Sequence, residues 1–177
     1  ALETVDFTAI STASLAALGT TQVQAITTAQ AQSLTTAQAV ALGTAQVAAL
    51  ETADFAAIST RSLTALKTAQ LVAMTTEQAQ SLTTAQASAL GTAQLVALET
   101  RDFAAISTTS LAALRAAQIT ALTTAELVAL TTDQAQALTT LQVQALGTAQ
   151  VQALETVDFA AISTASIAAL ATAQIVA

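Results

Sequence analysis

Threonine recurs at every eighth residue of the 177-residue chain, from Thr4 to Thr172, and is replaced only once, by Ala116. The register never slips, so the chain consists of about 22 copies of one octapeptide. A unit this short cannot bury its apolar side alone and has to pack against its neighbours. The sequence therefore predicts a single repeat array over residues 1–177, built as a solenoid or fibre. The array begins and ends at the same point of the octapeptide, and we expect it to be an excerpt of a longer one.

The octapeptide has a fixed pattern of apolar and polar positions. We number it so that the regular leucine is position 3, as in Gln24-Ala25-Ile26-Thr27-Thr28-Ala29-Gln30-Ala31. Position 3 is Leu, Ile or Met, position 5 is the constant Thr, and position 7 is mostly Gln. Position 8 is Val, Leu, Ile, Phe or Ala, and position 2 is nearly always Ala. We expect positions 2, 3 and 8 to form the core and the variable positions 1, 4 and 6 to face solvent.

Two helix-start signals fall within each octapeptide. Thr27 followed three residues later by Gln30 is the capping-box pattern, and Ile26 with the position 8 residue forms the hydrophobic-staple pair. These signals predict one short helix per octad, which is stable only when it is stacked on others. One continuous helix is excluded, because two turns per octad would need about 4.0 residues per turn, far from the 3.6 of an α-helix.

The exact position of the N-cap is left open by the sequence. The capping-box slot is position 4, yet the invariant Thr is at position 5 and could itself be the N-cap. In that case position 4 would end the previous helix, where a C′ glycine is common. Glycine occurs at this position four times, at Gly19, Gly43, Gly91 and Gly147.

A β-solenoid with a stacked threonine ladder is the alternative fold, since positions 3, 5 and 7 alternate. Abundant Ala, Gln and Leu, and few β-branched residues other than Thr, argue against it. We therefore predict an all-α solenoid of very short helices, one per octad.

A longer period lies on top of the octad. The motif Leu-Glu-Thr-x-Asp-Phe recurs at 2–7, 50–55, 98–103 and 154–159, at intervals of 48, 48 and 56 residues. This indicates a 48-residue, six-octad superrepeat with one extra octad in the third copy. We expect six octads to make a whole number of solenoid turns, so that the Phe and acidic residues return to one face. Two or three octads per turn would both satisfy this condition.

Composition excludes several classes of function. His, Cys, Trp, Tyr and Pro are absent, so the usual general bases, thiol nucleophiles and zinc ligands are missing. We expect no enzymatic activity and no cofactor. The formal charge of −7, with only four basic residues, disfavours nucleic acid and anionic membrane surfaces as partners. No run of roughly 18 apolar residues is present, so no membrane span is expected.

The acidic residues of the longer motif are the best candidates for a binding site. Glu and Asp three residues apart, followed in the first copy by Ser11 and Ser14, could supply oxygen ligands for calcium. The structural alternative is that Asp replaces Gln as a capping partner and that Glu favours a helix N-terminus. Gln at position 7 could similarly form an amide ladder between units. The candidate calcium ligands are Glu3, Asp6, Glu51, Asp54, Glu99, Asp102, Glu155 and Asp158.

The segment Leu138-Thr139-Thr140-Leu141-Gln142-Val143-Gln144-Ala145-Leu146 resembles the first helix of the repeats in transcription-activator-like effectors, whose period is several times longer. The whole chain resembles the Thr/Ala/Gln-rich short-repeat regions of very large secreted or surface proteins of Gram-negative bacteria. This second resemblance implies an extracellular or cell-surface filament, stalk or spacer. Its partners would be copies of itself or adjacent repeats of the same chain. The alternative is a calcium- or ligand-binding adhesin module that uses the Glu-x-x-Asp-Phe face.

Overall fold

The computed structural model describes residues 3–175, and within that range the chain forms short helices and connecting segments but no strand. Each octad forms one helix of four to six residues, which begins at the constant Thr or, once, at Ala116. The prediction of an all-α solenoid is confirmed. The β-solenoid alternative is wrong, because the helix-start signals of each octad outweigh the alternation of positions 3, 5 and 7.

The helices are α1 (Thr4–Ala9), α2 (Thr12–Ala16), α3 (Thr20–Gln24), α4 (Thr28–Ser33), α5 (Thr36–Ala41), α6 (Thr44–Ala49), α7 (Thr52–Ala57), α8 (Thr60–Ala65), α9 (Thr68–Val72), α10 (Thr76–Ser81), α11 (Thr84–Ala89), α12 (Thr92–Val96), α13 (Thr100–Ala105), α14 (Thr108–Ala112), α15 (Ala116–Ala121), α16 (Thr124–Val128), α17 (Thr132–Ala137), α18 (Thr140–Ala145), α19 (Thr148–Ala153), α20 (Thr156–Ala161), α21 (Thr164–Ala168) and α22 (Thr172–Ile175).

The N-cap of each helix is position 4, so the constant Thr is the first helical residue, N1. Before α4, Thr27 has extended backbone angles, and its hydroxyl accepts from the backbone N–H of Gln30 at 3.4 Å. The Gln30 side-chain oxygen in turn accepts from the Thr27 N–H at 2.9 Å, which completes the capping box. The alternative with position 5 as N-cap is wrong. The four glycines are N-caps with φ between −68° and −75°, not left-handed C′ residues.

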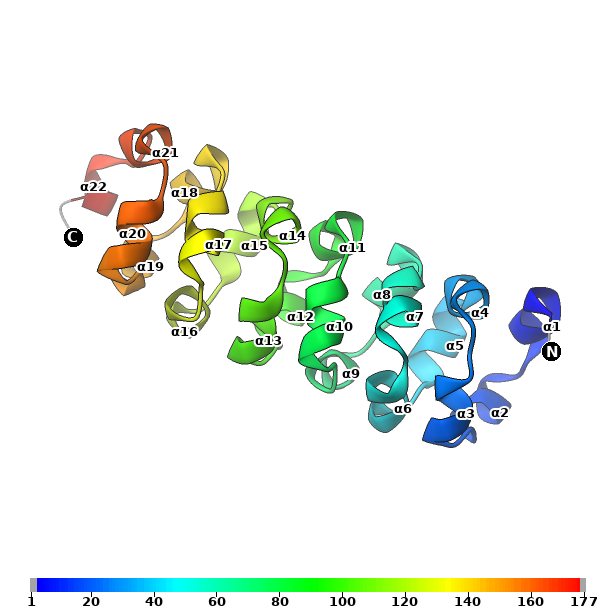
Figure 1. Cartoon of the computed structure of the whole chain (residues 1–177). Coiled ribbons are helices and arrows are strands. Elements are labelled where there is room, and N and C mark those ends of the chain that lie inside the picture. Colours follow the sequence, from blue (N-terminus) through cyan, green and yellow to red (C-terminus); the bar gives the residue numbers. More distant parts are fainter. Residues whose placement is uncertain (1–2, 176–177) are drawn as a thin grey trace.

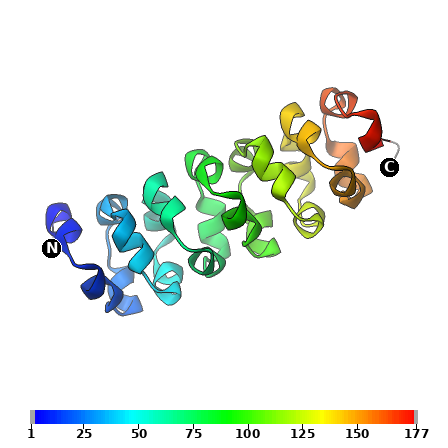
Figure 2. The same cartoon turned by 180° about the vertical axis from the view of Figure 1, so that it is seen from behind.

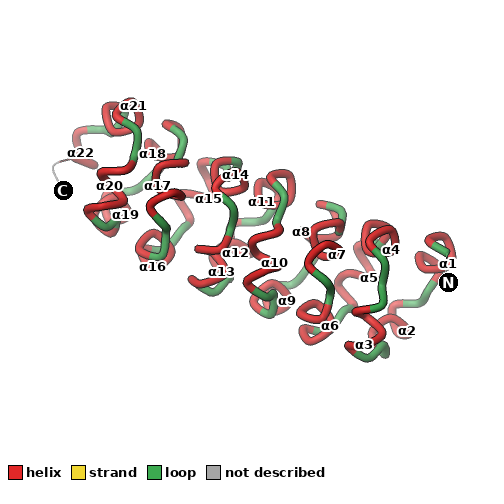
Figure 3. The backbone as a smooth tube through the Cα atoms, viewed as in Figure 1, coloured by secondary structure: helices red, strands yellow, loops and turns green. Residues whose placement is uncertain are grey.

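Three octads make one turn of the solenoid. Helix α4 packs against α1 and α7, α5 against α2 and α8, and α6 against α3 and α9. The same spacing of three continues along the chain, and it divides the helices into three rows. The first row starts at α1, the second at α2 and the third at α3. Stacked turns produce an elongated rod with the two termini at opposite ends (Figure 1), as the view from behind also shows (Figure 2). Short connecting segments between helices form the corners of each turn (Figure 3).

The core is a continuous column of position 3 and position 8 residues. At position 8, large and small side chains alternate from turn to turn in the first two rows, whereas the third row stays large: Phe55, Leu63 and Leu71 are followed by Ala79, Ala87 and Leu95, all fully buried. The 48-residue superrepeat is therefore one large turn plus one small turn. Position 2 contributes less than expected, since alanines such as Ala49 are only partly buried against this core.

The extra octad shifts the longer pattern by one row. Phe7, Phe55 and Phe103 lie in α1, α7 and α13, which all belong to the first row. Phe159 lies in α20, which packs on α17 in the second row. The six-octad interval is thus two complete turns, and the seven-octad interval moves the aromatic residue to a neighbouring side of the rod.

The alternation of large and small turns can be tested at the α7–α10 contact. We expect Phe55→Ala to lower the free energy of unfolding by about 3–5 kcal/mol through cavity formation, and Ala79→Leu to lower it by about 1–3 kcal/mol through overpacking. The double variant should lose less than the sum, because the added leucine fills part of the cavity. Urea unfolding followed by circular dichroism measures all three. Simple additivity would contradict the alternation as a packing requirement.

Candidate functional site

The side chain at position 7, which is helix position N3, joins each turn to the preceding one. Gln78 is 1% exposed, and its Oε1 accepts from the Thr75 N–H at 3.0 Å. Its Nε2 donates to the carbonyls of Val47 and Leu50 at 2.9 and 2.7 Å, at a corner of the turn before. One amide therefore caps its own helix and satisfies two carbonyls at the end of another.

The same arrangement recurs along the rod. Other glutamines whose Nε2 donates to carbonyls of the preceding turn are Gln38, Gln46, Gln70, Gln86, Gln94, Gln118, Gln134, Gln142, Gln150 and Gln174. The predicted link between units is present, but its form differs from a stacked amide ladder. Each amide bonds backbone carbonyls, because the glutamine oxygen is already used by the N-cap of its own helix.

The candidate aspartates at N3 are also buried against the preceding turn. Asp54 is 3% exposed and accepts a hydrogen bond from the Thr28 hydroxyl at 2.7 Å. Asp102 accepts from Thr76 at 2.7 Å, and Asp158 accepts from Thr132 at 2.8 Å. These helices have Glu at the N-cap and form no capping box, unlike the helices with Gln at N3, so the interpretation of Asp as a capping partner is wrong. Each Asp carboxylate instead accepts a hydrogen bond from the N1 threonine of the preceding turn.

In three of the four acidic pairs, the two carboxylates lie in different environments. Glu3, Glu51, Glu99 and Glu155 are exposed N-caps, whereas the paired Asp residues face inward, except for Asp6 in the first turn, which is exposed. Ser11 and Ser14 bond to each other at the start of α2. Among residues 3–175 there is no group of three or more acidic residues placed to hold a metal ion. Calcium binding by these residues stays a prediction.

Charged side chains gather on one side of the first row. Arg101 contacts Asp102 at 3.3 Å and Glu99 at 3.5 Å. The pKa of Glu77, one turn earlier, is lowered by a hydrogen bond from its own backbone N–H, then by one with Thr75, and to a smaller extent by the positive charge of Arg101. Glu77 is fully exposed and the Arg101 side chain is largely exposed, so these two charges contribute to surface electrostatics, whereas Asp102 is buried.

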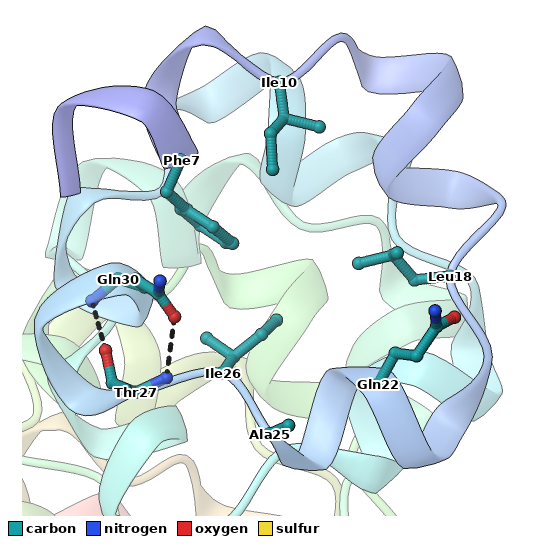
Figure 4. Close-up of a pocket in the computed structure, with 8 residues that line it drawn as sticks. All are labelled: Phe7, Ile10, Leu18, Gln22, Ala25, Ile26, Thr27 and Gln30. Carbon is teal, nitrogen blue, oxygen red and sulfur yellow. Dashed lines mark hydrogen bonds between the residues drawn. The ribbon is translucent and has the colours of Figure 1, made fainter. Parts of the chain in front are cut away.

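The surface has shallow recesses that were not anticipated from the sequence, two of which are lined as follows. The first lies in the first turn and is lined mainly by apolar side chains, among them Phe7, Ile10, Leu18 and Ile26 (Figure 4). Phe7 and Ile26 point toward one another across it, above the capping box of α4. The second lies between α13 and α16, beside Thr100, Thr124 and Val128. Neither recess is lined by a charged side chain.

None of the helices within residues 3–175 has both the length and the apolar character needed to cross a bilayer. This agrees with the expectation drawn from the sequence.

These features define the chain as a helical solenoid repeat protein, whose turns are joined by N3 side chains. The family model of the ALTTAQ repeat matches five segments, residues 1–36, 47–84, 95–132, 119–148 and 151–177, and the chain belongs to this repeat family. No curated protein and no solved structure shows significant similarity to it.

The contribution of the N3 contact can be measured by comparing two glutamines of the same helix. We expect Gln78→Ala to lower the free energy of unfolding by about 2–3 kcal/mol, because it removes three hydrogen bonds and leaves buried carbonyls without a donor. Gln80→Ala is the matched control, since Gln80 is exposed and the change should stay within about 0.5 kcal/mol. Denaturant unfolding of both variants tests this. Equal losses would show that the turn-to-turn amide contact is unimportant.

Proposed function

We propose that this chain has a mechanical function, as a segment of a rod or filament, and that it is not an enzyme. The observation that carries the proposal is the recurrence of one turn-to-turn contact, from Gln38 in α5 to Gln174 in α22. Because each turn docks on the last through the same core and the same kind of N3 contact, rod length scales with the number of octads. Such a design suits spacing and stacking better than recognition of one small ligand.

The first turn offers a surface on which a further turn can stack. Gln22 of α3 bonds the Gly19 N–H at 2.8 Å through its Oε1, as the inner glutamines do with their own N-caps. Its side chain is exposed, whereas the equivalent Gln118 of α15 is fully buried and donates to the carbonyls of Ala87 and Leu90. The apolar recess beside Gln22 adds area that another turn would bury. That turn can come from the same chain or from a second copy.

End-to-end association is the consequence that we test first. We expect sedimentation velocity and negative-stain microscopy to show rods that lengthen as the concentration rises. Leu18→Lys, which places a charge at the edge of the first recess, should weaken association about tenfold or more. Leu141→Lys is the control, because Leu141 is 73% exposed and belongs to α18, far along the rod from the first turn. Single rods at every concentration would refute self-assembly and leave the function of a spacer within one chain.

Placement outside the cell or on its surface is part of the same proposal. It is supported by the resemblance to the short-repeat regions of large bacterial surface proteins. We expect an antibody against the repeat, or an added protease, to reach the protein on intact cells of its source. Protection from both until the cells are lysed would contradict a surface location.

A further inference from the structure

Helix α16 carries the only glutamate found at position 7 of any octad, Glu126. Its octad interrupts the longer pattern. In the first two superrepeats, the octad three places after the Phe octad contains the pairs Gln30-Ala31 and Gln78-Ala79. In the third, the pair Gln134-Ala135 comes one octad later, in α17. Helix α16 is therefore the inserted unit, and a glutamate occupies its N3 position.

One carboxylate oxygen of Glu126 has no partner in the protein. Oε2 accepts from the backbone N–H and the hydroxyl of Thr123 at 2.7 and 2.9 Å, as a capping glutamine oxygen does. The glutamate is only 2% exposed, and its Oε1 is buried without a hydrogen-bond partner among the described residues. A buried polar atom without a partner is costly, and Oε1 is therefore available as a ligand for a group from solution.

The corner of the preceding turn next to Oε1 is lined by carbonyl oxygens. Gln150, one turn further along the same row, donates through Nε2 to two carbonyls, 31 and 28 residues earlier, at 3.0 and 2.7 Å. The equivalent carbonyls for Glu126 belong to Leu95 and Leu98, at the corner between α12 and α13. Because Oε2 makes the capping contacts, Oε1 takes the place of the amide nitrogen. Three oxygen atoms thus gather where an amide elsewhere joins two turns.

Glu126 does not use the contacts that satisfy the buried carboxylate one turn below. That residue, Asp102, accepts from the Thr76 hydroxyl at 2.7 Å and forms an ion pair with Arg101 at 3.3 Å. The equivalent threonine for Glu126 is Thr100, 26 residues earlier, and Oε1 does not bond to it. Both ion pairs within the described part of the chain use Arg101, and neither includes Glu126. A buried carboxylate needs a positive charge beside it, and here a cation from solution can supply that charge.

We propose that an alkali-metal ion, Na⁺ or K⁺, binds between α16 and the preceding turn, with Oε1 of Glu126 and the carbonyl oxygens of Leu95 and Leu98 as its protein ligands. Carboxylate and carbonyl oxygens are the ligands that hard cations prefer. One positive charge neutralises one carboxylate, whereas a divalent ion would leave a net charge in the buried corner. The recess between α13 and α16, lined by Thr100 and Ala125, lets water complete the coordination shell.

The bound ion fastens the inserted helix to the rod. It bridges oxygen atoms that are all acceptors, in the way that a glutamine amide bridges two turns elsewhere. The next step along the row, from α16 to α19, is joined by the amide of Gln150 and needs no ion. Ion binding therefore stabilises one step of the rod and leaves the other steps unchanged.

Hydrogen exchange of the amides in residues 123–128, read by mass spectrometry at neutral pH, tests the proposal in sodium, potassium and tetramethylammonium chloride at equal concentration. Tetramethylammonium keeps the ionic strength constant but is too bulky to coordinate the three oxygens. We expect exchange to be about tenfold slower in the better of the two alkali salts, which is the effect of an ion present at about nine times its Kd. Equal exchange in all three salts, or a response to calcium chloride alone, would overturn the proposal.

Glu126→Gln removes the carboxylate and supplies the amide that the rest of the rod uses, so the variant keeps the fold. We expect its exchange in residues 123–128 to be slow and to be the same in the three salts. A dependence on alkali-metal ions that persists in this variant would place the ion elsewhere and overturn the proposal.

Gln78→Glu is the matched converse, since Gln78 lies one turn above Asp54 just as Glu126 lies one turn above Asp102. The change should create a second ion site at the carbonyls that the Gln78 amide now binds. We expect exchange in residues 75–80 to become about tenfold slower in an alkali salt than in tetramethylammonium chloride, a difference that the unaltered chain lacks there. Exchange in these residues that is faster but independent of the cation would contradict the assignment of the ligands.

Discussion

The fold depends on the hydrogen bonds that the N3 side chain makes at the ends of helices only four to six residues long. A helix this short leaves nearly all of its backbone N–H and C=O groups without a partner inside the helix. Glutamine at N3 supplies partners for both kinds of group. In Gln78, Oε1 accepts from the N-cap N–H of its own helix, and Nε2 donates to two carbonyls of the preceding turn. Stacking and capping are thus the same contact. This explains how helices too short to exist alone persist through a rod.

The alternation of large and small turns gives the core its longer period. A turn of 24 residues can present only three position 8 side chains to the axis, one per row. Phe55, Leu63 and Leu71 together have a larger side-chain volume than the position 8 residues of the next turn. That turn compensates with the small side chains of Ala79 and Ala87. Close packing makes this a property of neighbouring turns and not of single residues. The 48-residue superrepeat is therefore a packing unit, although each octad remains the folding unit.

Much of this architecture could be predicted from the octad, and the rest depends on contacts between turns. Thr27 and Gln30 indicate where a helix begins because capping is local, and Ile26 is identified as core by the hydrophobic staple. The number of octads per turn could not be deduced, because six is divisible by both two and three. The hydrogen-bond partner of Asp54 could not be predicted either. Thr28 lies 26 residues earlier, and only the three-octad turn brings the two residues together. The donor set of glutamine predicts that its amide bonds something, but not that its partners are backbone carbonyls.

An inserted octad is tolerated because each octad brings its own cap, helix and corner, and contacts mainly the octads three places away. The solenoid therefore continues without a break, and only the longer pattern loses its register. Residues of intermediate size soften that loss: in the first row, Phe103 is followed by Leu127 and Val151 instead of an Ala–Phe alternation. Apolar side chains of several sizes are available, so the core can stay filled by small changes of side-chain volume. The polar contact at the N3 position of α16 shows no such adjustment: Glu126 stands where most octads have Gln, and its buried Oε1 has no hydrogen-bond partner among the described residues.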